Sequence, residues 1–383
     1  MKKLDLISIF LILLFIIPNL RPIFKYSPVL PMLIMIIYSI LIYGLIAFSQ
    51  IQSVEINLKK WLGNYWFIFF VLVIVTLIIS QIYPIADNLK LQGRGSDQDN
   101  CVIAAANQIL SLRYPYSIRS YFGNPCSPLP GMLFLYLPFV YLNLYYIGAV
   151  FFAILAIVSI KQFTESLYSA AFFTTLLFGS IFHMEMLVVG SDLFLLGCGF
   201  VIVALKTAEA IIKVNLKTII ILAILTGLLS NTRINFVVLA PIMSFFIFLH
   251  WKKAGVIFGF ISLCFVMLPS GYLFYLNPEE FTPLHLLSKS DSLLRGGLKE
   301  VGVTSSIFAF LVGIYLTTKT PKNIPLSLLI SLSPMLLAVA FGDLIHFRKG
   351  QFSTWEGANY LLPIIPLALA IVTINLKRNN NLR

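Results

Sequence analysis

Long apolar runs follow one another from one end of the chain to the other, separated by short polar stretches. Several runs reach the roughly 20 residues that a helix needs to cross the hydrocarbon core of a bilayer. They lack the strict apolar–polar alternation of lipid-facing β-barrel strands. The pattern predicts an all-α polytopic membrane protein. We expect about twelve transmembrane helices, near residues 6–20, 29–48, 65–83, 129–158, 167–178, 193–205, 217–229, 236–249, 254–275, 306–317, 324–341 and 358–376.

The polar stretch at residues 93–139 interrupts this pattern more than any other. Within it, residues 97–112 have helical periodicity, with apolar side chains on one side and polar side chains on the other. The apolar side carries Val102, Ile103, Ala106, Ile109 and Leu110. A helix of this kind lies along a membrane interface, and Pro115 is expected to stop it. Polar clusters at the edge of a bilayer are costly to keep, so this stretch is the first candidate for a functional site.

Composition agrees with a membrane protein, since 59% of the 383 residues are hydrophobic and only 11% are charged. The mean hydropathy is +0.93. The net charge of +12 comes from basic residues scattered through the loops, so we expect membrane lipid and no nucleic acid as a partner. We predict a single integral membrane domain over residues 1–383. Its parts are additional N-terminal spans at 1–64, a catalytic external loop at 84–128 and a second long external loop at 276–305.

Lysine placement predicts the orientation. With both termini in the cytoplasm, the loops holding Lys59–Lys60, Lys161, Lys206, Lys213, Lys217, Lys252–Lys253, Lys319 and Lys322 face inward, as the positive-inside rule requires. Most acidic residues then face outward. We expect a prokaryotic plasma (inner) membrane and an active site on its external face. An alternating-access transporter is less favoured, because no internal repeat is evident and the polar residues collect at one interface.

Short motifs along the chain resemble those of a known family. They are Gly95-Ser96-Asp97, Tyr114-Pro115-Tyr116, Gly123-Asn124-Pro125 and Pro128-Leu129-Pro130-Gly131, with weaker similarity at Gly190-Ser191-Asp192, Asn231-Thr232-Arg233 and Asn359-Tyr360-Leu361-Leu362-Pro363. In this order they resemble the GT-C superfamily of membrane glycosyltransferases, and in particular its polyprenyl-phosphate-mannose-dependent (DUF2029-like) branch. The chain departs from that family in two respects: two predicted spans precede the span that leads into the first loop, where the family usually has one, and no large soluble C-terminal domain is expected.

The resemblance implies a GT-C-like fold and an inverting hexosyltransferase, with mannose as the sugar. The donor would be a polyprenyl-phosphate-linked sugar, the acceptor a lipid- or glycan-linked hydroxyl, and an aspartate of the first loop would be the base. Asp97 is the candidate for this role, because a carboxylate at the loop–helix junction is accessible to an acceptor hydroxyl. Asp99 is the second candidate, although Ser96 and Asp99 also fit a capping box that would give Asp99 a structural role.

A departing lipid phosphate requires cations or positioned donors, and the guanidinium group suits phosphate well. The external candidates for substrate binding are Arg94, Arg113, Arg119, Arg233, Arg295, His285 and Lys289. Asp192 is a further candidate for binding the acceptor. Each also has a structural interpretation: arginines anchor at interfaces, and Ser191-Asp192 can cap the following helix.

Other chemistry is less well supported by the sequence. His183 and Glu185 are too few for a metal site, and the four cysteines lack metal-ligand spacing. We therefore expect no cofactor, with a divalent cation left open. Cys101 and Cys126 share one external loop and could pair, but free thiols are the expectation. Two other functions remain as alternatives: a flippase or transporter for a lipid-linked sugar, and an O-antigen polymerase- or ligase-like enzyme.

Overall fold

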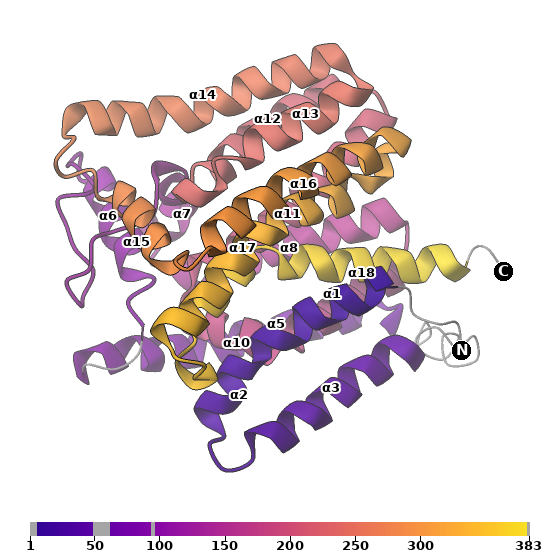
Figure 1. Ribbon diagram of the computed structural model, residues 1–383, viewed down its shortest axis with the longest axis horizontal. Helices are drawn as coiled ribbons and strands as arrows, with labels where there is room; N and C mark the ends of the chain where they lie inside the picture. The colour runs from indigo at the N-terminus through magenta and orange to yellow at the C-terminus, as the bar shows by residue number, and fades with distance from the viewer. Residues whose placement is uncertain (1–5, 49–61, 93–95, 381–383) are drawn as a thin grey trace.

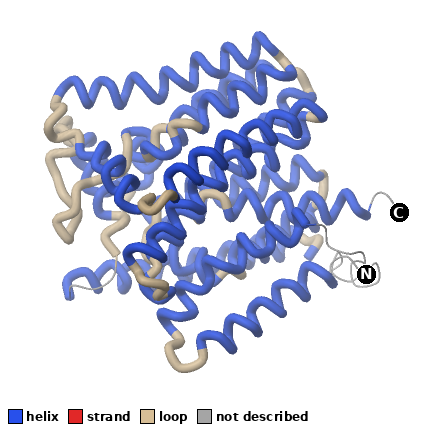
Figure 2. Tube along the Cα trace, in the orientation of Figure 1, coloured by secondary structure: helices blue, strands red, loops and turns tan. Residues whose placement is uncertain are grey.

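The computed structural model describes residues 6–48, 62–92 and 96–380, and over these ranges the regular structure is helical and contains no strand (Figures 1 and 2). The α-helices are α1 (Leu6–Ile16), α2 (Leu20–Tyr26), α3 (Pro31–Phe48), α5 (Tyr65–Asn88), α6 (Asn100–Leu110), α7 (Pro130–Tyr141), α8 (Tyr145–Thr164), α9 (Leu167–Phe178), α10 (Ile181–Val188), α11 (Asp192–Ile212), α12 (Leu216–Ser230), α13 (Leu239–His250), α14 (Lys252–Leu276), α15 (His285–Leu293), α16 (Leu298–Lys319), α17 (Ile324–Gly342) and α18 (Ile365–Asn380). Short 3₁₀ segments and one π-helix, η6 (Asp343–Phe347), connect several of them.

The predicted membrane-protein character is confirmed. Seven helical segments in the described part of the chain are long and apolar enough to cross a bilayer, and an eighth is obtained if α9 and α10, which meet at 70°, form one broken span. The remaining apolar helices have 10–17 residues. The seven segments are Ile9–Tyr26, Tyr65–Gln92, Tyr145–Thr164, Asp192–Ile212, Lys252–Leu276, Leu298–Lys319 and Pro321–Phe347.

Two sequence-based boundaries are wrong. The single span expected at 129–158 is two helices, α7 and α8, because the chain turns at Asn143, whose backbone is left-handed (φ 57°). Asparagine tolerates this conformation better than most residues. The loop expected at 276–305 is partly helical, since it contains all of α15 and the first turns of α16.

The amphipathic helix expected at 97–112 is present as α6, but its start differs from the capping box. The residue that precedes the first helical residue is Asp99, and its side chain makes no capping bond. The Ser96 hydroxyl instead accepts a hydrogen bond from the backbone nitrogen of Gln98 at 3.3 Å. Asp97 therefore lies in the turn before the helix, not in its first turn.

Helix α11 is the centre of the bundle. It is buried on nearly all sides and packs against α8, α12, α17 and α18. Two glycines allow this close packing: a Cβ at Gly197 would lie 2.8 Å from the carbonyl oxygen of Leu362, and one at Gly199 would lie 2.6 Å from a methyl carbon of Leu229. Small residues let membrane helices approach closely in this way. The first residue of α11 is Asp192, so the most deeply buried of the seven candidate spans fixes the position of a candidate site residue.

The helices at the periphery have the opposite character. α5, α14 and α16 expose many large apolar side chains, among them Phe69, Ile85, Phe260, Leu268 and Phe308. Exposed apolar surface of this extent marks contact with lipid or another protein, and on helices of spanning length it is the surface that faces lipid. In Figure 1, α14 and α3 lie on opposite flanks of the bundle, and the loops with α6 and α15 gather at the end away from the C-terminus.

The contact between the start of α7 and the end of α12 should tolerate no added side chain. A Cβ at Gly131 would lie 2.2 Å from the carbonyl oxygen of Leu228 and 2.5 Å from that of Asn231. We expect Gly131→Ala to lower the free energy of unfolding by about 1–3 kcal/mol, because the atoms that the new Cβ would contact belong to the backbone and can move away only if α12 is distorted. Gly271→Ala is the matched control, because Gly271 lies within α14 and an added Cβ there has no atom within 4 Å. Thermal unfolding of the purified protein measures both, and equal stability of the two variants would contradict the packing described here.

Candidate functional site

A cavity of about 960 Å³ lies at the end of the bundle where α11 begins and α5 ends. Five residues selected from the sequence line it: Asp97, Asp192, Arg233, His285 and Lys289. They come from the turn before α6, the start of α11, the turn after α12 and helix α15. The cavity therefore gathers side chains that are far apart in the sequence.

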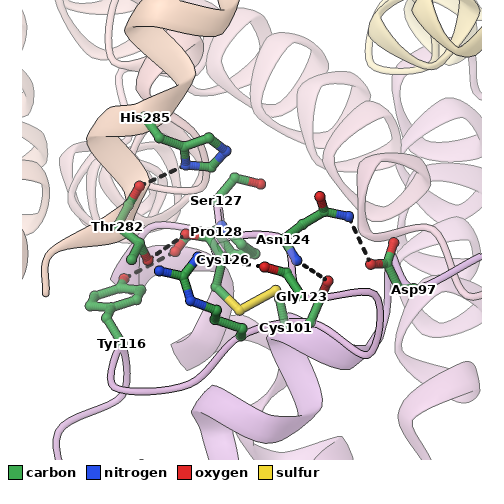
Figure 3. The surroundings of a disulfide bond; sticks show 12 residues. Asp97, Cys101, Tyr116, Gly123, Asn124, Cys126, Ser127, Pro128, Thr282 and His285 are labelled. Atoms are coloured by element: carbon green, nitrogen blue, oxygen red, sulfur yellow. Dashed lines mark hydrogen bonds between the residues drawn. A yellow bond between two sulfur atoms is a disulfide. The ribbon is translucent and has the colours of Figure 1, made fainter.

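A disulfide between Cys101 and Cys126 organises the loop in front of the cavity (Figure 3). The expectation of free thiols at these positions is wrong. The bond joins α6 to the segment that leads into α7, and the hydroxyl of Thr282 donates to the carbonyl oxygen of Cys126 at 2.8 Å. The buried hydroxyl of Tyr116 donates to the carbonyl oxygen of Pro128 at 3.0 Å. Covalent and hydrogen-bonded ties thus hold three separate loop segments together.

Asp97 lies at the edge of this loop and lines the cavity. Its side chain is half-buried, and its Oδ2 accepts a bond from the amide nitrogen of Asn124 at 3.4 Å (Figure 3). Asn124 is itself held by a bond from its backbone nitrogen to the hydroxyl of Ser120. Asp97 forms no ion pair with a described residue, so its carboxylate is free to accept a proton from a molecule in the cavity.

Asp99 has a different environment. It is 1% exposed, does not line the cavity, and accepts a hydrogen bond from the hydroxyl of Tyr83 on α5 at 2.5 Å. Burial raises its pKa to about 6, while the Tyr83 hydrogen bond and the charge of Lys90, 4.0 Å away, act in the opposite direction. Gly190 packs against the same group, since a Cβ there would lie 2.8 Å from the Tyr83 ring and 3.1 Å from Cβ of Asp99. The structure gives Asp99 a packing role between α5 and α6.

Asp192 and Arg233 form an ion pair on the cavity wall. Nη2 of Arg233 lies 2.6 Å from Oδ2 of Asp192, which is 1% exposed, and Nη1 donates to the hydroxyl of Ser127. Nε of Arg233 is buried and has no hydrogen-bond partner in the described part of the protein. Backbone bonds from Leu129 to Thr232 and from Gly131 to Asn231, 2.9 and 2.8 Å long, fix the two loops that carry Ser127 and Arg233.

Helix α15 adds His285 and Lys289 to the cavity. Nδ1 of His285 lies 2.7 Å from the carbonyl oxygen of Thr282, so this nitrogen carries the hydrogen and Nε2 is left for a ligand. Burial lowers the pKa of His285, and the charges of Lys289 and Arg233 lower it further. The imidazole is therefore neutral near pH 7 and faces a positively charged neighbourhood.

The remaining candidates lie elsewhere. Arg113, Arg119 and Arg295 are exposed and do not line the cavity, although Nη1 of Arg119 reaches the carbonyl oxygen of Gly123 at 3.5 Å. Arg94 lies outside the described residues. The cavity also contains residues that the sequence did not single out, because each sits beside an apolar run: Arg21, Lys25, Asp343, Arg348 and Glu356. Asn359 and Tyr360, from the last of the motifs with weaker family similarity, line it as well. Burial raises the pKa of Tyr360 while Arg233 opposes it, so these two side chains are within electrostatic reach.

His183 and Glu185 do not form a pair. Nδ1 of His183 bonds to the carbonyl oxygen of Leu177 at 2.8 Å, and Glu185 pairs with Lys25 at 2.8 Å. Among the described residues, no group of three or more His, Cys, Asp or Glu side chains is arranged to hold a metal ion. The polar residues that line the cavity include carboxylates, cations and amides.

Comparison of the chain with protein families, with curated proteins and with solved structures finds no match. The function must therefore be inferred from the chemistry of the cavity.

The buried Asp99 should make stability depend on pH. Its pKa is about 6 in the folded protein against 3.8 for the free side chain, so the folded state binds the proton more tightly. The free energy of unfolding therefore falls as pH rises from about 4 to about 6. Deprotonation of Asp99 lowers it over this range by an amount on the order of 2 kcal/mol. Asp99→Asn keeps the acceptor for Tyr83 and removes the titration. We expect the variant to lose less stability than wild type between these pH values in thermal unfolding, and parallel pH profiles would contradict this assignment.

Proposed function

We propose that the protein is a GT-C-type membrane hexosyltransferase. It transfers a hexose, mannose by resemblance, from a polyprenyl-phosphate donor to a lipid- or glycan-linked hydroxyl. The observation that carries the proposal is the cavity itself, which joins Asp97, a carboxylate without an ion-pair partner among the described residues, to a half-buried arginine, Arg233, and to an apolar helix that faces lipid. A polyprenyl-phosphate sugar needs all three kinds of surface at once.

The apolar end of α5 supports a lipid-linked substrate. Ile82, Ile85 and Leu89 line the cavity and are also 42%, 64% and 38% exposed. They continue the exposed apolar face of α5. A hydrocarbon chain that lies along this face stays in contact with apolar groups and is not transferred to water. A polyprenyl tail can therefore remain in the bilayer while its phosphate and sugar enter the cavity.

The cations of the cavity support binding of the phosphate. Lys289 forms no ion pair with a described residue, and Nε of Arg233 is a donor without a partner. Arginine binds phosphate oxygens through its planar group, and such charge-assisted bonds are roughly twice as strong as neutral ones. We assign the donor phosphate to the side of the cavity formed by Arg233 and Lys289, where the free Nε2 of His285 can accept a hydrogen bond from a sugar hydroxyl.

The reaction then follows from the remaining carboxylate. Asp97 takes the proton of the acceptor hydroxyl, and the acceptor oxygen bonds to the anomeric carbon of the donor sugar with inversion. The bond between that carbon and the phosphate oxygen breaks, and polyprenyl phosphate leaves with its electron pair. Arg233 and Lys289 stabilise the charge that develops on the leaving group. We do not assign this role to Asp192, because its Oδ2 is paired with Arg233 at 2.6 Å and the residue is only 1% exposed.

The distribution of basic residues supports an external active site. Lys161, Lys206, Lys213, Lys252 and Lys319 all lie where helices end or begin opposite the cavity. The positive-inside rule assigns that end, with both termini, to the cytoplasm. The cavity would then open on the external face of a prokaryotic plasma membrane, with the shorter apolar helices completing the set of about twelve spans expected for the fold.

Loss of the base should abolish transfer. We expect Asp97→Asn to lower kcat by about 10²–10⁴-fold with a polyprenyl-phosphate hexose, because the amide cannot accept the proton. Asp291→Asn is the control, since Asp291 is an exposed acid on α15 that pairs with Lys299 and does not line the cavity. Product formation with the purified protein measures both. Unchanged turnover in Asp97→Asn would exclude Asp97 as base, and lipid movement across liposomes without a new glycosidic bond would favour the flippase alternative.

Arg233 should have separable effects on stability and binding. Arg233→Gln leaves Asp192 buried without its partner, which typically costs about 3–5 kcal/mol. Adding Asp192→Asn removes that charge and should restore most of the thermal stability. Both proteins should bind the donor more weakly, as a raised KM for the polyprenyl-phosphate sugar. Recovery of donor affinity together with stability in the double variant would mean that Arg233 has a structural role only.

A further inference from the structure

The cavity has a second polar wall, which the proposed reaction does not use. It is formed by α2 and by the segment from Asp343 to Tyr360, and we name it the α2 wall. Nη1 of Arg21 donates to the amide oxygen of Asn359, and Nη2 of Arg348 lies 2.8 Å from Oε2 of Glu356. None of these residues belongs to the side assigned to the phosphate.

The charges of the α2 wall are paired. Lys25 lies 2.8 Å from Oε1 of Glu185, and Nε of Arg21 lies 3.9 Å from the other oxygen of the same carboxylate. Arg348 contacts Asp343 at 3.5 Å as well as Glu356. The opposite side differs, because Lys289 has no carboxylate partner among the described residues. An anion would therefore gain less at the α2 wall and would meet Glu356 and Asp343 as like charges.

Paired charges and amides present donors and acceptors side by side. A sugar hydroxyl donates one hydrogen bond and accepts others, so it can bind between a guanidinium group and a carboxylate without adding charge. Arg348 and Glu356 offer this combination, since their side chains are 28% and 63% exposed. Tyr26 and Phe347 also line the cavity and are exposed, so the apolar face of a sugar can pack against their rings.

The backbone of this wall has an irregular geometry of the kind found at functional sites. Helix α17 passes into the π-helix η6 (Asp343–Phe347), and the chain then turns through Lys349 and Gly350 with φ of 47° and 81°. π-Helical turns occur mostly as single turns within α-helices, and they are frequent at functional sites. Oδ2 of Asp343 accepts a bond from the backbone nitrogen of Gly357 at 2.7 Å, and Nε1 of Trp355 donates to the carbonyl oxygen of Ala340 at 2.7 Å. These bonds hold the strained turn and direct Arg348 and Glu356 together.

We infer that the α2 wall binds an uncharged oligosaccharide, which is the sugar end of the acceptor. The identification of this oligosaccharide as the acceptor rests on the proposed function. The existence of a glycan site rests only on the residues of the wall. The donor phosphate then occupies the side with the unpaired cation, and the acceptor occupies the charge-paired side. The acceptor is thereby recognised by hydroxyl groups and not by a lipid phosphate.

Saturation-transfer NMR on the full chain in nanodiscs tests the site directly. The probes are mannotriose, maltotriose, galactotriose and chitotriose, with farnesyl phosphate and inorganic phosphate as anionic competitors. We expect at least one trisaccharide to bind wild type and to remain bound when either anion is present. Glu356→Gln should weaken that binding about tenfold, because a hydrogen bond to a charged group is lost. Lys289→Gln is the matched control on the opposite side and should leave it unchanged.

Several results would overturn the site. The first is that none of the four trisaccharides binds. The second is that binding persists in Glu356→Gln and also in the double variant that combines Arg348→Gln with Glu356→Gln. The third is that either anion displaces the trisaccharide. Glu356→Gln alters an exposed carboxylate, so a folded variant is expected even if the double variant fails to fold. Sugar transfer is measured on the same samples. Trisaccharide binding without transfer would overturn the transferase and keep the glycan site, whereas transfer without trisaccharide binding would overturn the site alone.

Discussion

The ion pair between the buried Asp192 and the half-buried Arg233 is the constraint on which the site depends. Charges at the edge of a hydrocarbon layer are costly unless they are paired, and removing one partner leaves the other uncompensated. The pair joins the first residue of the central helix α11 to the turn after α12, and through Ser127 to the loop before α7. Three distant parts of the chain must therefore meet at one place, and the cavity forms around that place.

The loops in front of the pair are held by different means. The Cys101–Cys126 disulfide fixes the loop to α6, and Thr282 connects the same loop to the segment that leads into α15. As a result, Asp97 and His285 reach the cavity from elements that make no regular packing with α11. The central helix supplies the paired charge, while the tethered loops carry Asp97 and His285, which we propose contact the substrate. This division resembles that of many enzymes, in which loops carry function on a rigid scaffold.

Local pattern predicted much of the fold. The range 167–178 coincides with α9, and the amphipathic α6 was expected from the spacing of its apolar residues. Asp192 and Arg233 were candidates, but no local signal relates residues 41 positions apart, so their contact was not predictable. Arg21 and Lys25 were missed for the same reason, since their partner Glu185 lies about 160 positions away. The turn at Asn143 was missed because apolar residues continue through it.

A cryo-electron microscopy structure with a polyprenyl phosphate bound tests the central claim most directly. The phosphate is expected within hydrogen-bond distance of Arg233, on the side of the cavity with Lys289, and the tail is expected along Ile82 and Ile85 of α5. In that position the phosphate oxygen that would carry the sugar faces Asp97. Density for the lipid at the opposite end of the bundle, or a phosphate bound away from Arg233 with Asp97 out of reach, would contradict the proposed transferase.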